Sequence, residues 1–287
     1  MRMFLWKRPK VGLALSGGGA RGLAHIGVLK VLEREGIPID FLAGASMGGA
    51  VAAFYASGWS VESMEEEALR VSKLRHLIEL VDYGLLTKPG LLEGQRVRRY
   101  LVERLGDITF DDLKIPLALV AVDLDSGEEV ILRSGSVVEA VRATGSLPGL
   151  LAPLRLDGRL LVDGGVLNNL PADVVRRMGA DIVIAVDVGI KLEDLPPLLE
   201  AERQRLPLTQ IPLIIETLRR TVGIMEGWIT AQKLAQAKPE VLIRPKLSND
   251  VVLTSFSRAA ECIAAGEEAA TAALPGIRKA LRRRFWR

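Results

Sequence analysis

The sequence predicts a three-layer α/β/α fold with a mainly parallel central sheet. Several short segments are apolar throughout, as strands are when both faces of their sheet are covered. These segments alternate with longer ones whose apolar residues recur at helical spacing. The chain has no internal repeat and no clear linker, so one domain is expected over residues 1–287.

Each expected element follows from the local pattern of apolar residues and from the turn residues beside it. The expected strands are Val11–Ser16, Phe41–Ala45, Leu117–Asp123, Glu129–Arg133, Leu160–Val162, Ile182–Val188 and Val241–Ile243. The expected helices are Gly22–Glu35, Met47–Ala56, Val61–Lys73, Glu93–Leu105, Val137–Ala143, Ala172–Met178, Ile214–Lys238 and Arg258–Leu281, the last broken near Pro275. Glu193–Pro212 contains four prolines and mixed charge, which favours a surface connection or a lid.

Composition excludes several classes of protein. One cysteine, Cys262, cannot form a disulfide within the chain, and two histidines, His25 and His76, do not favour a catalytic zinc site. Phe41–Val61 is uncharged and long enough to span a bilayer. It is rich in Ala, Gly and Ser, however, and glycines interrupt it, so a buried strand followed by a buried helix is favoured.

The net charge of +3 comes from the two ends of the chain. Residues 1–10 contain four basic residues, residues 278–287 contain six, and neither segment contains an acid. The remainder has 28 basic and 35 acidic residues. Trp and Phe accompany the basic residues at both ends, which suits contact with an anionic membrane surface. Two solvated basic arms that bind nothing are the alternative.

A GxSxG motif, Gly44-Ala45-Ser46-Met47-Gly48, lies where a predicted strand ends and a helix begins. In such an elbow the serine occupies a strained turn, so the residues two before and two after it must be small. The following helix directs its positive end at the serine, which favours developing negative charge. Ser46 is therefore the candidate nucleophile, although a small-residue turn needed only for packing remains open.

A second glycine-rich segment, residues 16–22, follows the first strand and matches GxGxxG. A dinucleotide-binding fold is not favoured, because no acid follows the second strand to hold a ribose. A Walker loop is excluded because no GK[ST] follows. The amides of consecutive glycines can instead form an oxyanion hole. Arg21 could hold this loop, contact a phosphate group, or form a surface salt bridge.

The base that would activate Ser46 is not an obvious histidine. No histidine follows His76, and His25, which could lie near Ser46, is better interpreted as packing within its helix. Asp163 follows a short strand and precedes Gly164-Gly165, which allow close backbone approach. Asp163 is the first choice. Other carboxylates near strand ends are its rivals: Asp123, Asp125, Asp181 and Asp187.

Together, GGGARG at 17–22, GASMG at 44–48 and DGG at 163–165 resemble the patatin-like phospholipase family. The similarity runs from about Val11 to Val188 and includes a further segment, Val241–Pro245. In detail the chain is most similar to the short bacterial branch, related to the catalytic region of neuropathy target esterase.

The resemblance implies a patatin-like fold and a Ser46–Asp163 dyad in place of a triad. It implies an oxyanion hole in the loop of Gly17, Gly18 and Gly19, formed by the amides of the last two and braced by Arg21. Gly22, Gly44, Gly48, Gly164 and Gly165 would support these motifs. The activity implied is hydrolysis of fatty acyl esters in phospholipids, lysophospholipids or simpler lipids, without a metal or organic cofactor.

Two other functions fit the same motifs. A lipid transacylase would use an alcohol or lysolipid in place of water, and an inactive lipid-binding module would keep only the fold. The expected partners are a lipid or other ester and an anionic membrane surface; no nucleic acid is expected, and a homo-oligomer is left open. A cytoplasmic protein, peripheral at the inner membrane face, fits these expectations.

Overall fold

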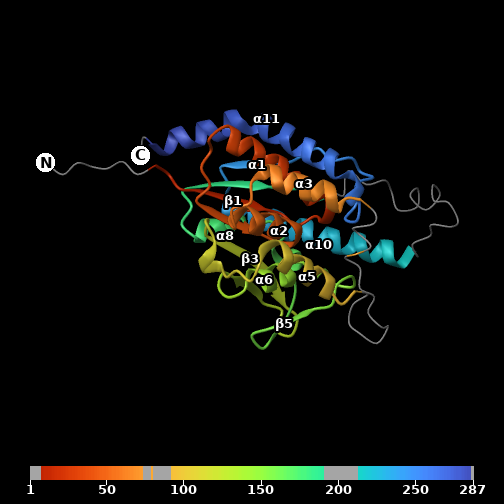
Figure 1. Ribbon diagram of the computed structural model, residues 1–287. Coiled ribbons are helices and arrows are strands. Elements are labelled where there is room, and N and C mark those ends of the chain that lie inside the picture. Colours follow the sequence, from red (N-terminus) through yellow and green to blue (C-terminus); the bar gives the residue numbers. More distant parts are fainter. Residues whose placement is uncertain (1–7, 74–78, 80–91, 191–212, 286–287) are drawn as a thin grey trace.

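A computed structural model describes residues 8–73, 79, 92–190 and 213–285 (Figure 1). An eight-stranded sheet forms its centre, in the order β5-β6-β3-β2-β1-β7-β8, with β4 also paired to β3. The strands are β1 Val11–Leu15, β2 Phe41–Gly44, β3 Leu117–Asp123, β4 Glu129–Leu132, β5 Leu154–Leu156, β6 Arg159–Asp163, β7 Ile182–Val186 and β8 Val241–Ile243. The predicted α/β class is confirmed.

The sheet is parallel through its middle and antiparallel at one side. Strands β3, β2, β1, β7 and β8 run parallel, whereas β4, β5 and β6 pair antiparallel. Strand β5 was not predicted, because it has three residues and none of them is buried. A strand without a buried face lacks the apolar pattern by which strands are predicted.

The helices fall close to the predicted ranges. They are η1 Gly19–Leu23, α1 Ala24–Arg34, α2 Ser46–Ala56, α3 Val61–Val71, α5 Gln95–Leu105, η2 Phe110–Asp112, α6 Val137–Thr144, α7 Gly165–Asn168, α8 Ala172–Arg177, α10 Leu213–Ala237, η5 Phe256–Arg258 and α11 Ala259–Phe285. The short helix α7 was not predicted. Glu193–Pro212, predicted as a surface connection or a lid, lies outside the described residues.

Two predictions for the C-terminal region are wrong. Helix α11 continues through Pro275 instead of breaking there. Pro275 lies on the exposed side of the helix, where water can satisfy the backbone carbonyl left without a donor, and buried Leu274 and Ile277 hold the helix on the core. Residues 278–285, predicted as a basic arm, belong to this helix, and Arg278 pairs with Glu35 at 2.6 Å.

Alternate residues of β1 divide the core into two layers. Val11, Leu13 and Leu15 belong to the apolar cluster shared with α1, α2 and α11. Gly12 and Ala14 face α8, and a Cβ on Gly12 would lie 2.7 Å from the Ala180 Cβ. Helices therefore cover both faces of the sheet, as predicted for strands that are buried throughout.

Helices α1 and α11 pack along the same edge of the molecule, far from β5 (Figure 1). A Cβ on Gly27 would lie 1.9 Å from the Ile263 carbonyl oxygen, and a Cβ on Gly266 would lie 1.9 Å from the Ala24 carbonyl oxygen. Glycine at both positions lets the two backbones touch. Lys30 adds ion pairs that tie α1 to α3 and α11.

The uncharged stretch Phe41–Val61 forms β2 and α2 at the centre of the fold. Ala43, Ala45, Ala52 and Ala53 are completely buried. Small side chains let the strand and helix pack closely against their neighbours. Within the described ranges, no helix has both the length and the apolar character needed to cross a bilayer.

Candidate functional site

The strand register brings Ser46 and Asp163 to the same level of the sheet. Gly44 pairs with Leu119 of β3, and Ala121, two residues further along β3, pairs with Asp163. Ser46 lies two residues beyond Gly44, so it reaches the level of Ala121. Only two strand spacings, about 10 Å between backbones, then separate the serine from the aspartate, and their side chains can meet across β3.

Ser46 occupies the strained turn that the GxSxG motif predicts. Its φ of 50° lies in the left-handed region, which is costly for a residue with a side chain. The flanking glycines are needed for space: a Cβ on Gly44 would lie 2.6 Å from the Gly48 carbonyl oxygen, and one on Gly48 would lie 2.4 Å from that of Ser16. The strained serine is thus held where β2 turns into α2.

Thr144, at the end of α6, fixes the backbone of the nucleophile. Its buried hydroxyl accepts a hydrogen bond from the Ser46 N–H at 3.0 Å and donates one to the Val120 carbonyl. Two residues later, the Ser146 carbonyl accepts from the Asp163 N–H at 3.0 Å. One short segment therefore positions both candidate catalytic residues. This role of Thr144 could not be predicted, because its partners are distant in the sequence.

Asp163 is almost completely buried, with 2% of its surface exposed. Its Oδ1 accepts the Gly165 N–H at 2.7 Å, and within the described chain it forms no ion pair. Burial raises the pKa of Asp163 to about 6, although hydrogen bonding to the Ser46 hydroxyl and to Gly165 opposes the rise. The carboxyl is thus a stronger base than an exposed aspartate.

The contact between Ser46 and Asp163 is not a fully formed hydrogen bond. The second carboxyl oxygen, Oδ2, is buried and has no partner of ordinary hydrogen-bond geometry among the described residues. The serine hydroxyl therefore approaches from a longer distance or at a less favourable angle than an ideal bond requires. Such contacts are common in unliganded active sites and shorten when a substrate is bound.

The glycine loop lies directly beside the nucleophile. A Cβ on Gly17 would lie 3.0 Å from the Ser46 Cβ and 2.4 Å from Asn169 Oδ1. The Gly17 N–H is already used, since it donates to the Asn169 carbonyl at 3.0 Å. In the described structure, the N–H groups of Gly18 and Gly19 have no acceptor. Of the three predicted oxyanion-hole glycines, these two have amides available to a ligand.

The back of this loop packs against residues 248–253. Gly19 has a φ of 54°, and a Cβ there would lie 2.4 Å from the Leu253 carbonyl oxygen. Arg21 is buried and donates to the carbonyls of Val188 at 2.8 Å and Val251 at 3.0 Å. Of the three roles considered for Arg21, the structure fits the one that holds the loop.

His25 is also buried near the elbow, but it is engaged with the backbone. Its Nε2 lies 2.8 Å from the Ser16 carbonyl oxygen, so this nitrogen carries the proton and donates. Burial lowers the pKa of His25 to about 4, which keeps the ring neutral. The structure thus agrees with the packing interpretation. His76 lies outside the described residues.

The rival aspartates are occupied by structural interactions. Asp123 accepts from the Asp125 N–H and the Ser126 hydroxyl, and Asp181 accepts the Lys10 N–H. Asp187 pairs with Arg244 at 3.0 Å. Asp125 is exposed in the same turn. Asp163 is the one of the five that lies against Ser46. Within the described ranges, no group of three potential ligands is arranged for a metal ion.

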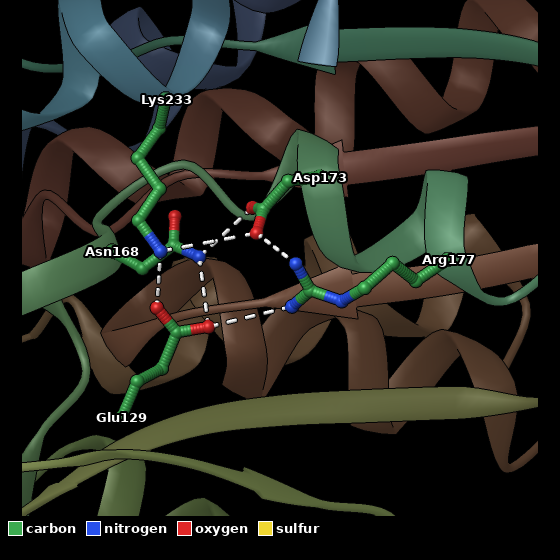
Figure 2. Close-up of polar contacts among 5 residues, drawn as sticks. All are labelled: Glu129, Asn168, Asp173, Arg177 and Lys233. Carbon is green, nitrogen blue, oxygen red and sulfur yellow. Dashed lines mark hydrogen bonds and ion pairs between the residues drawn. The ribbon is translucent and has the colours of Figure 1, made fainter. Parts of the chain in front are cut away.

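Helix α10 crosses next to this site and is fixed by a polar cluster (Figure 2). Lys233 of α10 pairs with Glu129 of β4, and Arg177 of α8 pairs with Asp173 at 2.6 Å and with Glu129 at 3.5 Å. The Asn168 amide donates to both carboxylates. This cluster connects α10 to α7, the helix that begins two residues after Asp163.

The charge of Asp163 acts on a second carboxyl, Glu226 of α10. Burial raises the pKa of Glu226 to about 7, and the negative charge of Asp163 adds to the rise. The sequence analysis did not identify Glu226. Its position seven residues before Lys233 puts both on one face of α10, but nothing in the sequence places that face against Asp163.

Comparisons with known proteins confirm the predicted family. A family model described as patatin-like phospholipase matches residues 13–176. Neuropathy target esterase sws of Drosophila melanogaster is 38% identical over 185 residues, which cover 62% of this chain and 13% of that protein. An uncharacterized NTE family protein of Mycobacterium tuberculosis is 37% identical over 183 residues, which cover 63% of this chain and 49% of that protein. The match thus spans less than half of either relative.

A solved structure supports the fold. VipD from Legionella pneumophila matches with a TM-score of 0.50 at 14% identity, and the match covers 94% of this chain and 67% of that chain. At this identity the likeness concerns the fold alone. It agrees with the sheet and the two helical layers described above.

Proposed function

Because this chain belongs to the patatin-like phospholipase family, we propose that it is a serine hydrolase of lipid esters. Ser46 is the nucleophile and Asp163 is the base. The observation that carries this proposal is the meeting of a strained, positive-φ serine with a buried carboxyl that has no cation partner in the described structure. Burial and the lack of a cation keep that carboxyl basic, as a group that must accept a proton requires.

The first half of the reaction forms an acyl-enzyme. The Ser46 Oγ attacks the ester carbonyl carbon while its proton passes to the Asp163 carboxylate. The C–O bond to the leaving alcohol then breaks, and the alcohol oxygen takes the proton from Asp163. In the second half, water attacks the acyl group, gives its proton to Asp163, and Ser46 leaves with that proton. Each cycle consumes one water, and no step requires a metal or cofactor.

The developing oxyanion is stabilised by the loop beside Ser46. The N–H groups of Gly18 and Gly19 have no acceptor in the described structure, whereas that of Gly17 is occupied. Removal of one such donor from an active site costs about 3–4 kcal/mol of transition-state stabilisation. Arg21 holds the loop from behind, so the donors are preorganised before substrate binds.

The test compares Ser46→Ala with Ser57→Ala. Ser57 lies at the other end of α2 and is partly exposed like Ser46, so it controls for loss of a hydroxyl on that helix. We expect Ser46→Ala to lower turnover of p-nitrophenyl esters and phospholipids by about 10³-fold or more, whereas Ser57→Ala keeps it. A fluorophosphonate probe should label the wild type and Ser57→Ala only.

Undiminished turnover or labelling in folded Ser46→Ala would overturn the assignment. Circular dichroism and urea unfolding of both variants would test whether the fold is retained. Product analysis with an added alcohol identifies the acyl acceptor: free fatty acid as the main product supports the hydrolase, and an ester of the added alcohol as the main product contradicts it.

A further inference from the structure

The side chain of Asn169 lies between the proposed nucleophile and the proposed base, and the mechanism above gives it no role. A Cβ on Gly17 would lie 2.4 Å from Asn169 Oδ1 and 3.0 Å from the Ser46 Cβ. A Cβ on Gly165 would lie 3.0 Å from the same Oδ1 and 3.1 Å from Asp163 Oδ1. The amide oxygen of Asn169 is therefore a neighbour of Ser46 on one side and of Asp163 on the other.

Asn169 is held in place by its backbone and by the residues beside it. It follows α7, and its carbonyl accepts the Gly17 N–H at 3.0 Å. Of its chain neighbours, Asn168 is fixed in the polar cluster of Figure 2 and Leu170 is completely buried. The position of the Asn169 side chain is thereby set before a ligand arrives, as a preorganised site requires.

The amide of Asn169 is nevertheless available to a ligand. The side chain is partly exposed, and within the described residues it forms no hydrogen bond. By contrast, the amide of Asn168 donates to Glu129 and Asp173. Polar side chains that are partly enclosed by protein are usually hydrogen-bonded. An unused amide beside two reacting groups therefore indicates contact with a molecule that takes part in the reaction.

The amide oxygen suits water better than it suits an alcohol. Asn169 Oδ1 is closer than Cγ to the Cβ positions of both glycines, so the oxygen is the end that points toward them, and it can only accept hydrogen bonds. Water has two O–H groups and can donate one to the Asp163 carboxylate and the other to Asn169 Oδ1. An alcohol that donates to Asp163 has no second O–H, so it places carbon against Oδ1 and leaves this oxygen without a donor.

We propose that Asn169 is a catalytic residue that binds the attacking water in deacylation and so selects water over an alcohol as the acyl acceptor. This inference rests on the proposed function, because it concerns the second half of the same reaction. The water oxygen bonds to the acyl carbon while one of its protons passes to the Asp163 carboxylate. The other proton, held by Asn169 Oδ1, stays on that oxygen and becomes the hydroxyl hydrogen of the fatty acid. The Ser46 Oγ then leaves with the proton from Asp163.

The experiment measures how one acyl-enzyme divides between two acceptors. A p-nitrophenyl ester is turned over in water that contains methanol, and the fatty acid and its methyl ester are both quantified. Because both products come from the same acyl-enzyme, their ratio does not depend on the acylation rate or on the fraction of folded protein. A loss of stability alone therefore leaves the ratio unchanged.

The variants are Asn169→Ala and Asn169→Leu, which remove the amide, the second with a side chain of similar shape. Asn168→Ala is the matched control, since it removes a neighbouring amide that is fixed in the polar cluster. We expect the ratio of methyl ester to fatty acid to rise about three- to tenfold in both Asn169 variants, as the loss of one hydrogen bond to water predicts. Asn168→Ala should keep the wild-type ratio, although its unfolding free energy falls.

An unchanged ratio in both Asn169 variants, or an equal rise in Asn168→Ala, overturns the inference. Fluorophosphonate labelling separates this failure from failure of the proposed function. If the wild type is labelled at Ser46 and the ratio is unchanged, only the role of Asn169 fails. If the wild type is not labelled at Ser46, the proposed function fails as well.

Discussion

Two buried titratable side chains near the elbow, Asp163 and His25, contrast in what they contact. His25 donates to the Ser16 carbonyl, and burial keeps its pKa low, at about 4. Asp163 faces the Ser46 hydroxyl, and burial keeps its pKa high, at about 6. In both cases burial favours the neutral form. The difference lies in the partner: His25 holds backbone, whereas Asp163 faces the side chain proposed to react.

This contrast shows that burial and a shifted pKa do not by themselves identify a base. His25 is as deeply buried as Asp163 and lies in the helix that follows the glycine loop, yet its proton-bearing nitrogen is occupied. The other ring nitrogen, Nδ1, is buried and has no hydrogen-bond partner among the described residues, Ser46 included. Contacts with the reacting group decide the assignment.

The largest expected effect is on activity. Asp163→Asn should lower kcat by about 10²–10⁴-fold, because the amide cannot accept the Ser46 proton. His25→Phe should keep kcat within about tenfold, because the ring is proposed only to hold the Ser16 carbonyl. Ester hydrolysis by the folded variants tests both values. Equal losses of kcat in the two variants would contradict the different roles given to Asp163 and His25.

The second expected effect is on stability as pH changes. Between pH 4 and 6.5, the unfolded chain protonates His25 and the folded protein does not, so this residue makes stability rise with pH. Between about pH 4 and 6, the folded protein keeps a proton on Asp163 that the unfolded chain releases, so this residue makes stability fall as pH rises. Each contribution is on the order of 3 kcal/mol.

Substitution should separate these opposing slopes. Relative to the wild type, the unfolding free energy of Asp163→Asn should increase from pH 4 to 6, and that of His25→Phe should decrease over the same range. Urea unfolding monitored by tryptophan fluorescence measures both. Parallel curves for the wild type and both variants would mean that neither residue is buried as the structure describes.

The smallest expected effect concerns Thr144, which holds the Ser46 backbone much as His25 holds that of Ser16. Thr144→Val removes the acceptor of the Ser46 N–H and should lower the unfolding free energy by about 1–3 kcal/mol. Thr144→Ser keeps the hydroxyl and loses only a methyl group, so it is the matched control. Equal stability of the two variants would show that the hydroxyl contributes little.

Features that depend on nearby residues were predicted well. The strand-to-helix turn at Ser46 and the space needed at Gly44 follow from local backbone sterics. Gly48 and Gly164 were predicted from their small-residue motifs, although the carbonyls they approach, those of Ser16 and Val120, are distant in the sequence. A Cβ on Gly164 would lie 2.2 Å from the Val120 carbonyl oxygen, as the prediction of close approach requires. Most helices and strands also matched, because their apolar periodicity is local.

Features that depend on distant contacts could not be predicted. Thr144 and Asn169 reach the site from α6 and from the turn after α7, and no spacing in the sequence indicates where they meet. Nor could the contact that occupies the Gly17 N–H be predicted, because its acceptor, the Asn169 carbonyl, is distant in the sequence. The prediction of a helix break at Pro275 was wrong for the same reason. Tertiary packing on either side of the proline outweighs its local tendency to break the helix.

The glycine loop is supported from behind by a later part of the chain. Leu253 closes against Gly19, Val251 accepts from Arg21, and Ile263 and Gly266 press the backbone of α11 onto α1 directly after the loop. All of these supports lie beyond the segment matched by the family model, which ends at residue 176. A fragment trimmed to that segment would keep the serine and the aspartate but lose the residues that support the Gly18 and Gly19 amides proposed to bind the oxyanion. We therefore expect the proposed site to require residues beyond the segment that the family model matches.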